Sequence, residues 1–174
     1  MIVPPPELMG DDELAGSWVP ANCGMNRGRG LSGRDGYNRL LGMDVVDTLS
    51  RLLTAGPQRT VRWLDLCCGE GRALLEGAAL LRDRGLSERV TMVGVDLVDH
   101  VAGQPPPEVS FVTASATTWR PEHSFDLITC VHGMHYVGDK LGMLRDVASW
   151  LRADRQFAAN FDATSIRLDS VPAG

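Results

Sequence analysis

The stretch VRWLDLCCGEGRALL, which begins at Val61, combines residue types from which a ligand-binding turn can be built. An apolar run ends at the acid Asp65, and two cysteines and the glycines Gly69 and Gly71 follow before a helical pattern begins. Glycines let the backbone turn tightly beside a ligand, and the first N–H groups of a helix attract negative charge. A second acid, Asp96, stands about 25 residues after Gly71, where it can accept hydrogen bonds from ribose hydroxyls. The spacing therefore predicts a nucleotide-type site.

The elements that must position these residues alternate along the chain. Apolar runs predict strands over residues 61–67, 90–97, 109–114, 125–131 and 156–161, and helical periodicity predicts helices over 36–53, 71–84 and 141–151. Such alternation is typical of an α/β fold, in which helices cover both faces of a mostly parallel sheet. In open sheets of this class, ligands bind at the carboxyl ends of the strands.

The order acid, variable residue, small pair, Gly-x-Gly resembles the first motif of the class I S-adenosylmethionine-dependent methyltransferases. The sequence carries it as DLCCGEG, from Asp65 to Gly71, and lacks the three spaced glycines of the usual dinucleotide fingerprint. The resemblance extends over residues 37–161 and implies a Rossmann-like, mostly parallel sheet, which in this sequence is truncated after the fifth strand.

The resemblance also implies which residues hold S-adenosylmethionine. Asp65, Gly69 and Gly71 would hold its methionine part, with Cys67 as a small residue beneath it. Asp96, with the adjacent Leu97, would hold the ribose. After the third predicted strand, the family often has an acid and a small residue near the adenine. Ser115 and Ala116 occupy that place here.

Two other interpretations of the motif stay open. Asp65 could cap the following turn without touching a ligand. Cys67 and Cys68 could be metal ligands, but adjacent thiolates point in different directions and no second pair completes a tetrahedral site, so we expect no metal.

The segment TCVHGMHYVGDK follows the fourth predicted strand and therefore lies near the ligand crevice. His132 or His135 could act as a general base on a substrate hydroxyl or amine, with Tyr136 beside them. The alternative is a hydrogen-bonded structural histidine. Asp139 is expected to cap the next helix.

The region before the first strand is rich in glycine and arginine. We expect residues 1–20 to form a flexible acidic arm and residues 21–174 a single domain, with residues 21–55 folding over the cofactor as a lid. Residues of this lid could pair with a carboxylate of the cofactor or an anionic group of the substrate, namely Asn26, Arg27, Arg29, Arg34 and Tyr37. A solvated basic loop is the alternative.

Composition excludes several other functions. The net charge of -5 disfavours non-specific nucleic-acid binding, and no apolar run is long enough to span a membrane. The four cysteines show no disulfide framework, so we expect a cytoplasmic protein.

Family members continue with a sixth and a seventh strand, whereas only DATSIRLDSVPAG follows the fifth predicted strand here. An early end leaves an edge strand with unpaired backbone groups. We therefore expect a homo- or hetero-oligomer in which another chain completes the sheet; a shortened chain is the alternative.

These features together predict an S-adenosylmethionine-dependent methyltransferase, or methyltransferase-like protein, acting on a small molecule in natural-product biosynthesis. One alternative is a subunit of a heteromeric enzyme that catalyses elimination or ring closure, of the aziridine-forming type, on an anionic substrate. The other is a non-catalytic partner subunit.

Overall fold

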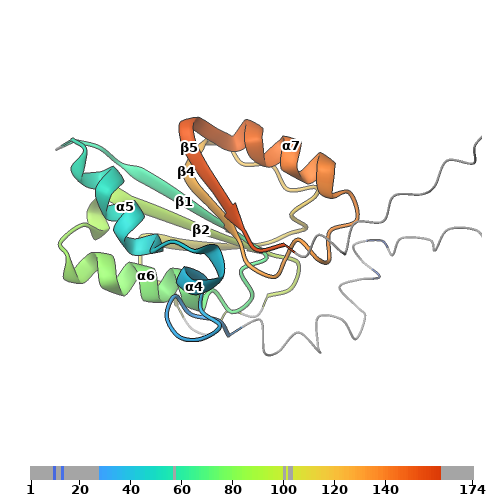
Figure 1. Ribbon diagram of the computed structural model, residues 1–174, viewed down its shortest axis with the longest axis horizontal. Coiled ribbons are helices and arrows are strands. Elements are labelled where there is room, and N and C mark those ends of the chain that lie inside the picture. Colours follow the sequence, from blue (N-terminus) through green and yellow to red (C-terminus); the bar gives the residue numbers. More distant parts are fainter. Residues whose placement is uncertain are drawn as a thin grey trace, which may run out of the picture.

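Five parallel strands form the sheet in the computed structural model, which describes residues 10, 13, 28–56, 58–99, 101 and 104–161 (Figure 1). The strands lie in the order β3-β2-β1-β4-β5. Their bounds are β1 (Val61–Leu66), β2 (Val90–Asp96), β3 (Val109–Thr113), β4 (Phe125–Cys130) and β5 (Leu151–Ala159). The predicted α/β fold with a parallel sheet is confirmed. Most of the expected arm, together with Asn26 and Arg27, lies outside the described residues.

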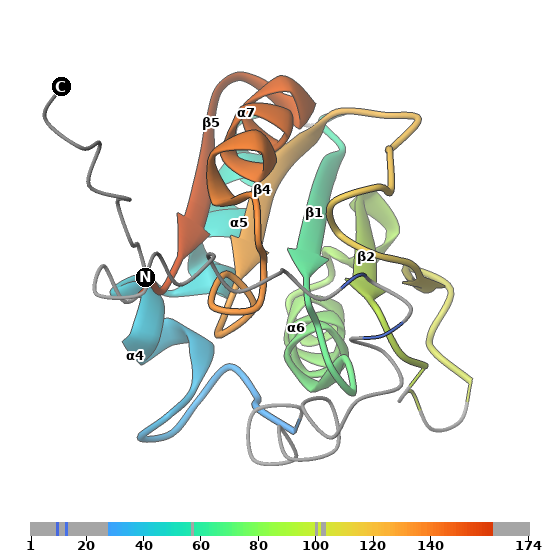
Figure 2. The ribbon, with the colours of Figure 1, turned by 90° about the vertical axis from the view of Figure 1, so that its right-hand side faces the viewer.

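Helices cover both faces of this sheet. One face packs against α4 (Tyr37–Leu41), α5 (Val45–Thr54) and α6 (Arg72–Asp83), and the other packs against α7 (Lys140–Trp150). A short 3-10 helix, η1 (Ser87–Arg89), precedes β2. Figures 1 and 2 show α7 alone on its side of the sheet. Alternate residues of β1 reach the two cores, with Trp63 in the first and Leu64 in the second, as the two-residue period of a strand requires.

The single helix predicted over residues 36–53 is wrong, because the chain turns between α4 and α5. Gly42 adopts the left-handed conformation with φ of 65° and ends α4. The Asn38 side chain then accepts a hydrogen bond from the N–H of Val45 at 3.1 Å, and Asp44 caps α5 by accepting from the N–H of Asp47 at 2.8 Å. Periodic leucines on both sides of the break conceal it from a pattern search.

The last strand also differs from its prediction. β5 starts at Leu151, directly after α7, and ends at Ala159, whereas the pattern predicted residues 156–161. Its first half is polar, because Arg152 and Arg155 reach back to a buried acid of β4, Asp126. A register irregularity between Phe125 and Leu127 accompanies this start. Apolar patterning therefore finds only the second half of the strand.

Asp139 caps α7 as predicted, because its side chain accepts from the N–H of Gly142 at 2.8 Å. The other elements agree with their predictions to within one or two residues. Within the described residues, no helix is both long and apolar enough to cross a lipid bilayer.

Close packing between β2, β3 and α6 fixes the floor under the turn that follows β1. A Cβ atom on Gly94 would lie 2.6 Å from the Phe111 ring, 2.8 Å from Cys68 Sγ and 2.8 Å from Leu74 Cδ1. Cβ atoms essentially never approach that closely, so Gly94→Ala should lower the free energy of unfolding by about 1–3 kcal/mol. Gly56→Ala is the matched control, since nothing lies within 4 Å of its added methyl group. Urea denaturation of both variants measures the difference, and equal stabilities would contradict this packing.

Candidate functional site

Every second residue of the turn between β1 and α6, from Cys67 to Gly71, has a left-handed backbone conformation. Cys67, Gly69 and Gly71 have φ of 57°, 59° and 69°. The turn is held to the sheet and closed on itself by two backbone hydrogen bonds, from Cys68 N to Val95 O at 3.2 Å and from Gly71 N to Cys68 O at 3.0 Å. Left-handed backbone is easy for glycine and costly for a cysteine, so Cys67 is a strained position at the tip of β1.

Gly71 is needed for packing as well as for its backbone angle. A Cβ atom there would collide with the ring of Phe111, which projects from β3. The first turn of α6 can therefore lie against the sheet only with glycine at this position. The motif glycines thus bring the start of α6 close to the carboxyl ends of the central strands, where the sequence predicts a ligand.

Asp96 braces the same turn from the end of β2. Its Oδ2 accepts from the N–H of Gly69 at 2.8 Å, and its Oδ1 accepts from the N–H of Val98 at 3.2 Å. The residue is half-buried, as is Leu97 after it. A carboxylate has about four acceptor positions, so Asp96 can brace the turn and still accept hydroxyl groups from a ligand.

Asp65 is fully buried one residue before the end of β1. Its Oδ1 accepts from the Thr129 hydroxyl at 2.6 Å, and its Oδ2 accepts from the Tyr37 hydroxyl at 2.9 Å. The indole N–H of Trp63 donates in turn to Thr129 Oγ1 at 2.9 Å. Asp65 therefore joins β1, β4 and α4 by side-chain hydrogen bonds, and it does not cap the turn or α6.

Burial raises the pKa of Asp65 to about 7, although the hydrogen bonds from Thr129 and Tyr37 lower it, and the nearby Asp96 raises it further. Burial and the Asp65 carboxylate together raise the pKa of Tyr37, which keeps its proton. Both hydroxyls donate to Asp65, an arrangement that suits the ionised carboxylate. A cation bound nearby would favour that form.

The described part of the predicted lid, residues 28–55, is fixed to α6 by its own hydrogen bonds. Buried Leu31 donates its N–H to Glu76 at 2.8 Å, and Arg72 holds the same carboxylate at 2.9 Å. Arg29 is half-buried and donates to the Asp35 carbonyl at 2.8 Å, whereas Arg34 is exposed. Tyr37 was predicted to pair with an anionic group of a ligand, but its hydroxyl donates to the carboxylate of Asp65.

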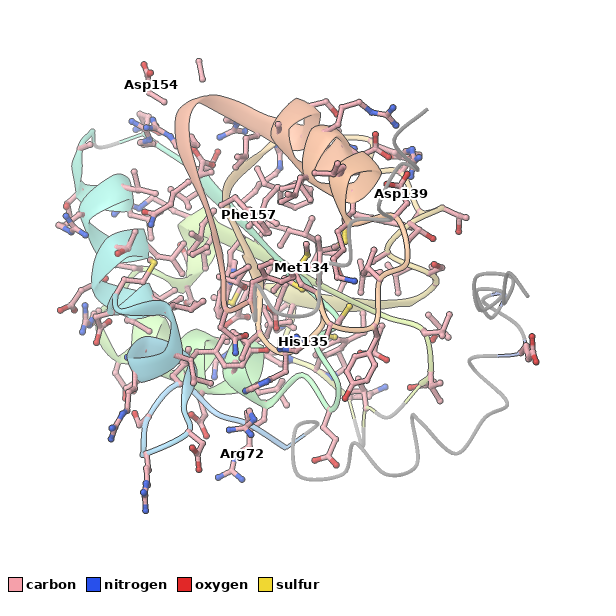
Figure 3. The ribbon with its side chains drawn as sticks, turned by 45° about the vertical axis from the view of Figure 1, so that its right-hand side comes forward. Arg72, Met134, His135, Asp139, Asp154 and Phe157 are labelled. Carbon is pink, nitrogen blue, oxygen red and sulfur yellow. The ribbon has the colours of Figure 1, made fainter. Side chains whose placement is uncertain are left out.

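The segment after β4 brings the two predicted histidines together. Their ring centroids are 5.9 Å apart, and the His135 ring stacks on Phe161 at 6.4 Å. Tyr136, the next residue, is exposed. Figure 3 shows His135 at the end of the sheet toward which the strands run. These side chains therefore lie at the carboxyl ends of β4 and β5, as the topology predicted.

His132 has a constrained backbone and a shifted pKa. It adopts φ of 60°, and its N–H donates to Asn160 Oδ1 at 2.6 Å. Burial lowers its pKa, and the positive charge of Arg29 and the neighbouring His135 lower it further, while Asp35 raises it. A lowered pKa keeps the imidazole neutral at pH 7, which is the form that can accept a proton.

Asn160 is a site residue that the sequence reasoning missed. It follows β5, and its amide also lies 3.4 Å from His132 Nδ1. Only the parallel pairing of β4 with β5 reveals that a residue 28 positions later holds His132. The adjacent Gly133 also has a packing role, since a Cβ atom there would lie 2.6 Å from Cys67 Sγ and 2.7 Å from Cys130 Sγ.

The cysteines beneath the turn carry un-ionised thiols. A hydrogen bond with Cys130, and then burial, raise the pKa of Cys67, while burial raises that of Cys68. Un-ionised thiols are poor metal ligands and suit small packing residues. Across the part of the chain that the structure describes, no group of three or more His, Cys, Asp or Glu side chains is placed to hold a metal ion.

Ser115 and Ala116 lie in the turn after β3. The Ser115 hydroxyl bonds Thr117 Oγ1 at 2.8 Å and accepts from the Thr117 N–H at 3.3 Å. Ala116 is buried at the edge of the core beneath α7. Ser115 thus shapes its own turn, and its contact with an adenine stays a prediction.

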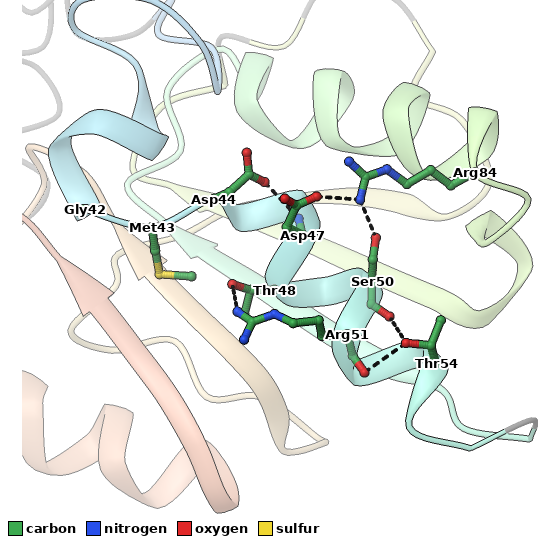
Figure 4. Close-up of a pocket in the computed structure, with 9 residues that line it drawn as sticks. All are labelled: Gly42, Met43, Asp44, Asp47, Thr48, Ser50, Arg51, Thr54 and Arg84. Atoms are coloured by element: carbon green, nitrogen blue, oxygen red, sulfur yellow. Dashed lines mark hydrogen bonds and ion pairs between the residues drawn. The ribbon is translucent and has the colours of Figure 1, made fainter.

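A separate shallow groove lies on the outer face of α5 (Figure 4). Its charged groups bond within the groove: Arg84 to Asp47 at 2.7 Å, and Arg51 to Thr48 at 3.0 Å. None of the predicted site residues lines it. We therefore locate the candidate site at the carboxyl ends of the strands.

The buried Asp65 should make stability depend on pH. Its pKa is 3.8 unfolded and about 7 folded, so its contribution is fully present below pH 3.8 and is lost as the pH rises through 7. Between pH 5 and 8 the wild type should lose about 3 kcal/mol of unfolding free energy that Asp65→Asn does not lose. The exposed Asp99 provides the control variant, Asp99→Asn. Urea titrations at both pH values measure this, and equal pH dependence in wild type and Asp65→Asn would contradict it.

The sequence matches the methyltransferase domain over residues 37–160. It has no match among curated proteins. Among solved structures, three complexes of the plantazolicin methyltransferase BpumL, each with a desmethylPZN analog and SAH, superpose with TM-scores of 0.60, 0.57 and 0.58 at 16% identity. The superposition covers 86% of this chain and 57% of BpumL.

A second neighbour is the SAM-dependent methyltransferase from Geobacter sulfurreducens in complex with S-adenosyl-L-homocysteine. It has a TM-score of 0.46 and 20% identity, covering 66% of this chain and 46% of its own. The chain thus spans about half the length of these structures, 57% of BpumL and 46% of the Geobacter sulfurreducens enzyme. The domain match includes all five strands of the sheet and the motif from Asp65 to Gly71, and the chain belongs to the methyltransferase-domain family.

Proposed function

We propose that the protein binds S-adenosylmethionine over the turn at residues 67–71 and transfers its methyl group to a small molecule. The observation that carries this proposal is Asp96, which is anchored to the N–H of Gly69 and keeps acceptor capacity for the two ribose hydroxyls. BpumL and the Geobacter sulfurreducens enzyme were both crystallised with the demethylated product of this cofactor.

The donor and acceptor groups of the turn suit this cofactor. Gly69 and Gly71 leave their backbone unobstructed by side chains, and Asp65 and Asp96 supply negative charge near a ligand that carries a sulfonium and an ammonium group. Ser115 and Ala116 remain our candidates for the adenine side. When bound, the cofactor supplies an electrophilic methyl group, so the protein's part is to orient the acceptor and to remove its proton.

His132 is our candidate for the group that accepts this proton. Its lowered pKa keeps it neutral near pH 7, and Asn160 fixes its backbone. His135 and Tyr136 lie beside it and complete the catalytic set that we propose. Arg29 and Arg34, on the lid side, could pair with an anionic group of the substrate. We place the substrate in natural-product biosynthesis, because BpumL was crystallised with a triazolic desmethylPZN analog.

A heteromeric enzyme is the second candidate, and the edge of the sheet favours it. Among the described strands β5 pairs with β4 alone, so one side of Leu151–Ala159 offers backbone donors and acceptors to another chain. We propose that a second chain, identical or different, pairs there. In such an assembly the chemistry could be elimination or ring closure instead of methyl transfer, or this chain could be a non-catalytic partner.

Removing the Asp96 carboxylate should weaken cofactor binding. Asp96→Ala loses both the ribose acceptors and the brace on Gly69, so we expect affinity for S-adenosylmethionine to fall about 10- to 100-fold. Asp99→Ala removes an exposed acid three residues later and should leave affinity unchanged. Isothermal titration calorimetry measures both variants. Absence of binding by the wild type, alone or in its native complex, would overturn the proposed function.

The edge of β5 that no described strand pairs with should be occupied in the native assembly. We expect light scattering after copurification from the native host to give a mass above that of one chain. Amide hydrogen exchange across residues 151–159 should then be slower in the assembly than in the isolated chain. A monomer with unchanged exchange along β5 would contradict the partner.

A further inference from the structure

Three arginines converge on one buried carboxylate at the end of the sheet opposite the candidate site. Asp126 Oδ2 lies 2.7 Å from Arg152 Nη1, and Oδ1 lies 3.1 Å from Arg155 Nε and 3.7 Å from Arg59 Nη2. The N–H of Arg62 also donates to Oδ2 at 3.0 Å. We call Arg59, Arg152 and Arg155 the arginine triad.

The triad is far from the proposed chemistry. Asp126 is the second residue of β4, Arg59 precedes β1, and the other two arginines belong to the start of β5. Figure 3 shows Asp154, between those two in sequence, at one end of the sheet and His135 at the other. The proposed cofactor and substrate residues are therefore not part of this cluster.

The triad carries more charge and more donors than Asp126 requires. Three guanidinium groups against one carboxylate leave a formal excess of two positive charges. Each guanidinium has five N–H donors. In the described part of the chain, the acceptors that they bond are the two oxygens of Asp126 and the carbonyl of Asp154, which Arg155 Nη1 meets at 2.9 Å.

The remaining donors can be reached by a ligand. The side chains of Arg59, Arg152 and Arg155 are 31%, 33% and 20% exposed, whereas Asp126 is completely covered. Like charges held this close repel one another, and a bound anion would relieve that repulsion. Planar guanidinium groups match tetrahedral oxyanions by paired hydrogen bonds, which favours phosphate over a spherical anion.

We propose that the arginine triad is a binding site for a phosphate dianion. Asp126 orients the guanidinium groups from the inside, and their outer N–H groups bind the phosphate oxygens. The phosphate could be free or belong to a phosphorylated small molecule, because the same chemistry recognises both. A bound phosphate would also hold the start of β5 against the loop before β1. This site does not depend on the proposed methyl transfer.

Binding can be tested on the full chain with inorganic phosphate. We expect saturable ³¹P line broadening and a rise in Tm relative to chloride at equal ionic strength. Arg59→Gln keeps the two arginines closer to Asp126, Arg152 and Arg155, and should lower the affinity for phosphate at least tenfold. Arg145→Gln, which changes a 78% exposed arginine paired with Asp146 on α7, should bind as the wild type does. Equal affinity in wild type and Arg59→Gln would overturn the site.

A second measurement needs no variant. Phosphate should shift the ¹⁵Nε resonance of Arg155 in the wild-type protein, and no shift at saturating phosphate would also overturn the site. Ribose 5-phosphate separates the two sources of the ligand. Tighter binding than inorganic phosphate supports a phosphorylated small molecule, and equal binding supports phosphate alone. Neither readout involves S-adenosylmethionine, so failure here leaves the proposed function intact.

Discussion

A single buried carboxylate links the parts of this protein that form the candidate site. Asp65 accepts hydrogen bonds from the hydroxyl groups of Thr129 on β4 and Tyr37 on α4. Its own strand leads directly into the glycine turn. An unpaired buried carboxylate would be costly, so these partners have to be present for β1 to end where it does. These two hydrogen bonds therefore fix α4 and β4 to the end of β1, and the turn that follows is held by its own backbone bonds and by Asp96.

Much of this arrangement could be predicted from the sequence because it depends on local patterns. The apolar run ending at Asp65, the glycines after it and Asp96 at the end of the second strand lie where the pattern placed them. The role of Tyr37 could not be predicted in the same way. Its partner is 28 residues away in the sequence. In addition, a segment that contains a tyrosine and several arginines has the composition of a binding loop.

The break between α4 and α5 and the early start of β5 were missed for a related reason. Apolar periodicity continues through Gly42. Only the left-handed backbone of Gly42 and the hydrogen bond from the Val45 N–H to the Asn38 side chain mark the break. At the other end of the chain, Arg152 and Arg155 are polar residues whose guanidinium groups are held in place by Asp126. Patterns of apolar residues do not detect a strand that is held in place by charge.

The left-handed backbone of His132 limits which amino acids this position can accept. Asparagine and glycine adopt such a φ readily, whereas alanine and the branched residues do so at a cost. Alanine at position 132 would therefore disturb the hydrogen bond from its N–H to Asn160 as well as remove the imidazole. Asparagine removes the imidazole while keeping the path of the chain, so the two replacements separate what the ring does from what the backbone does.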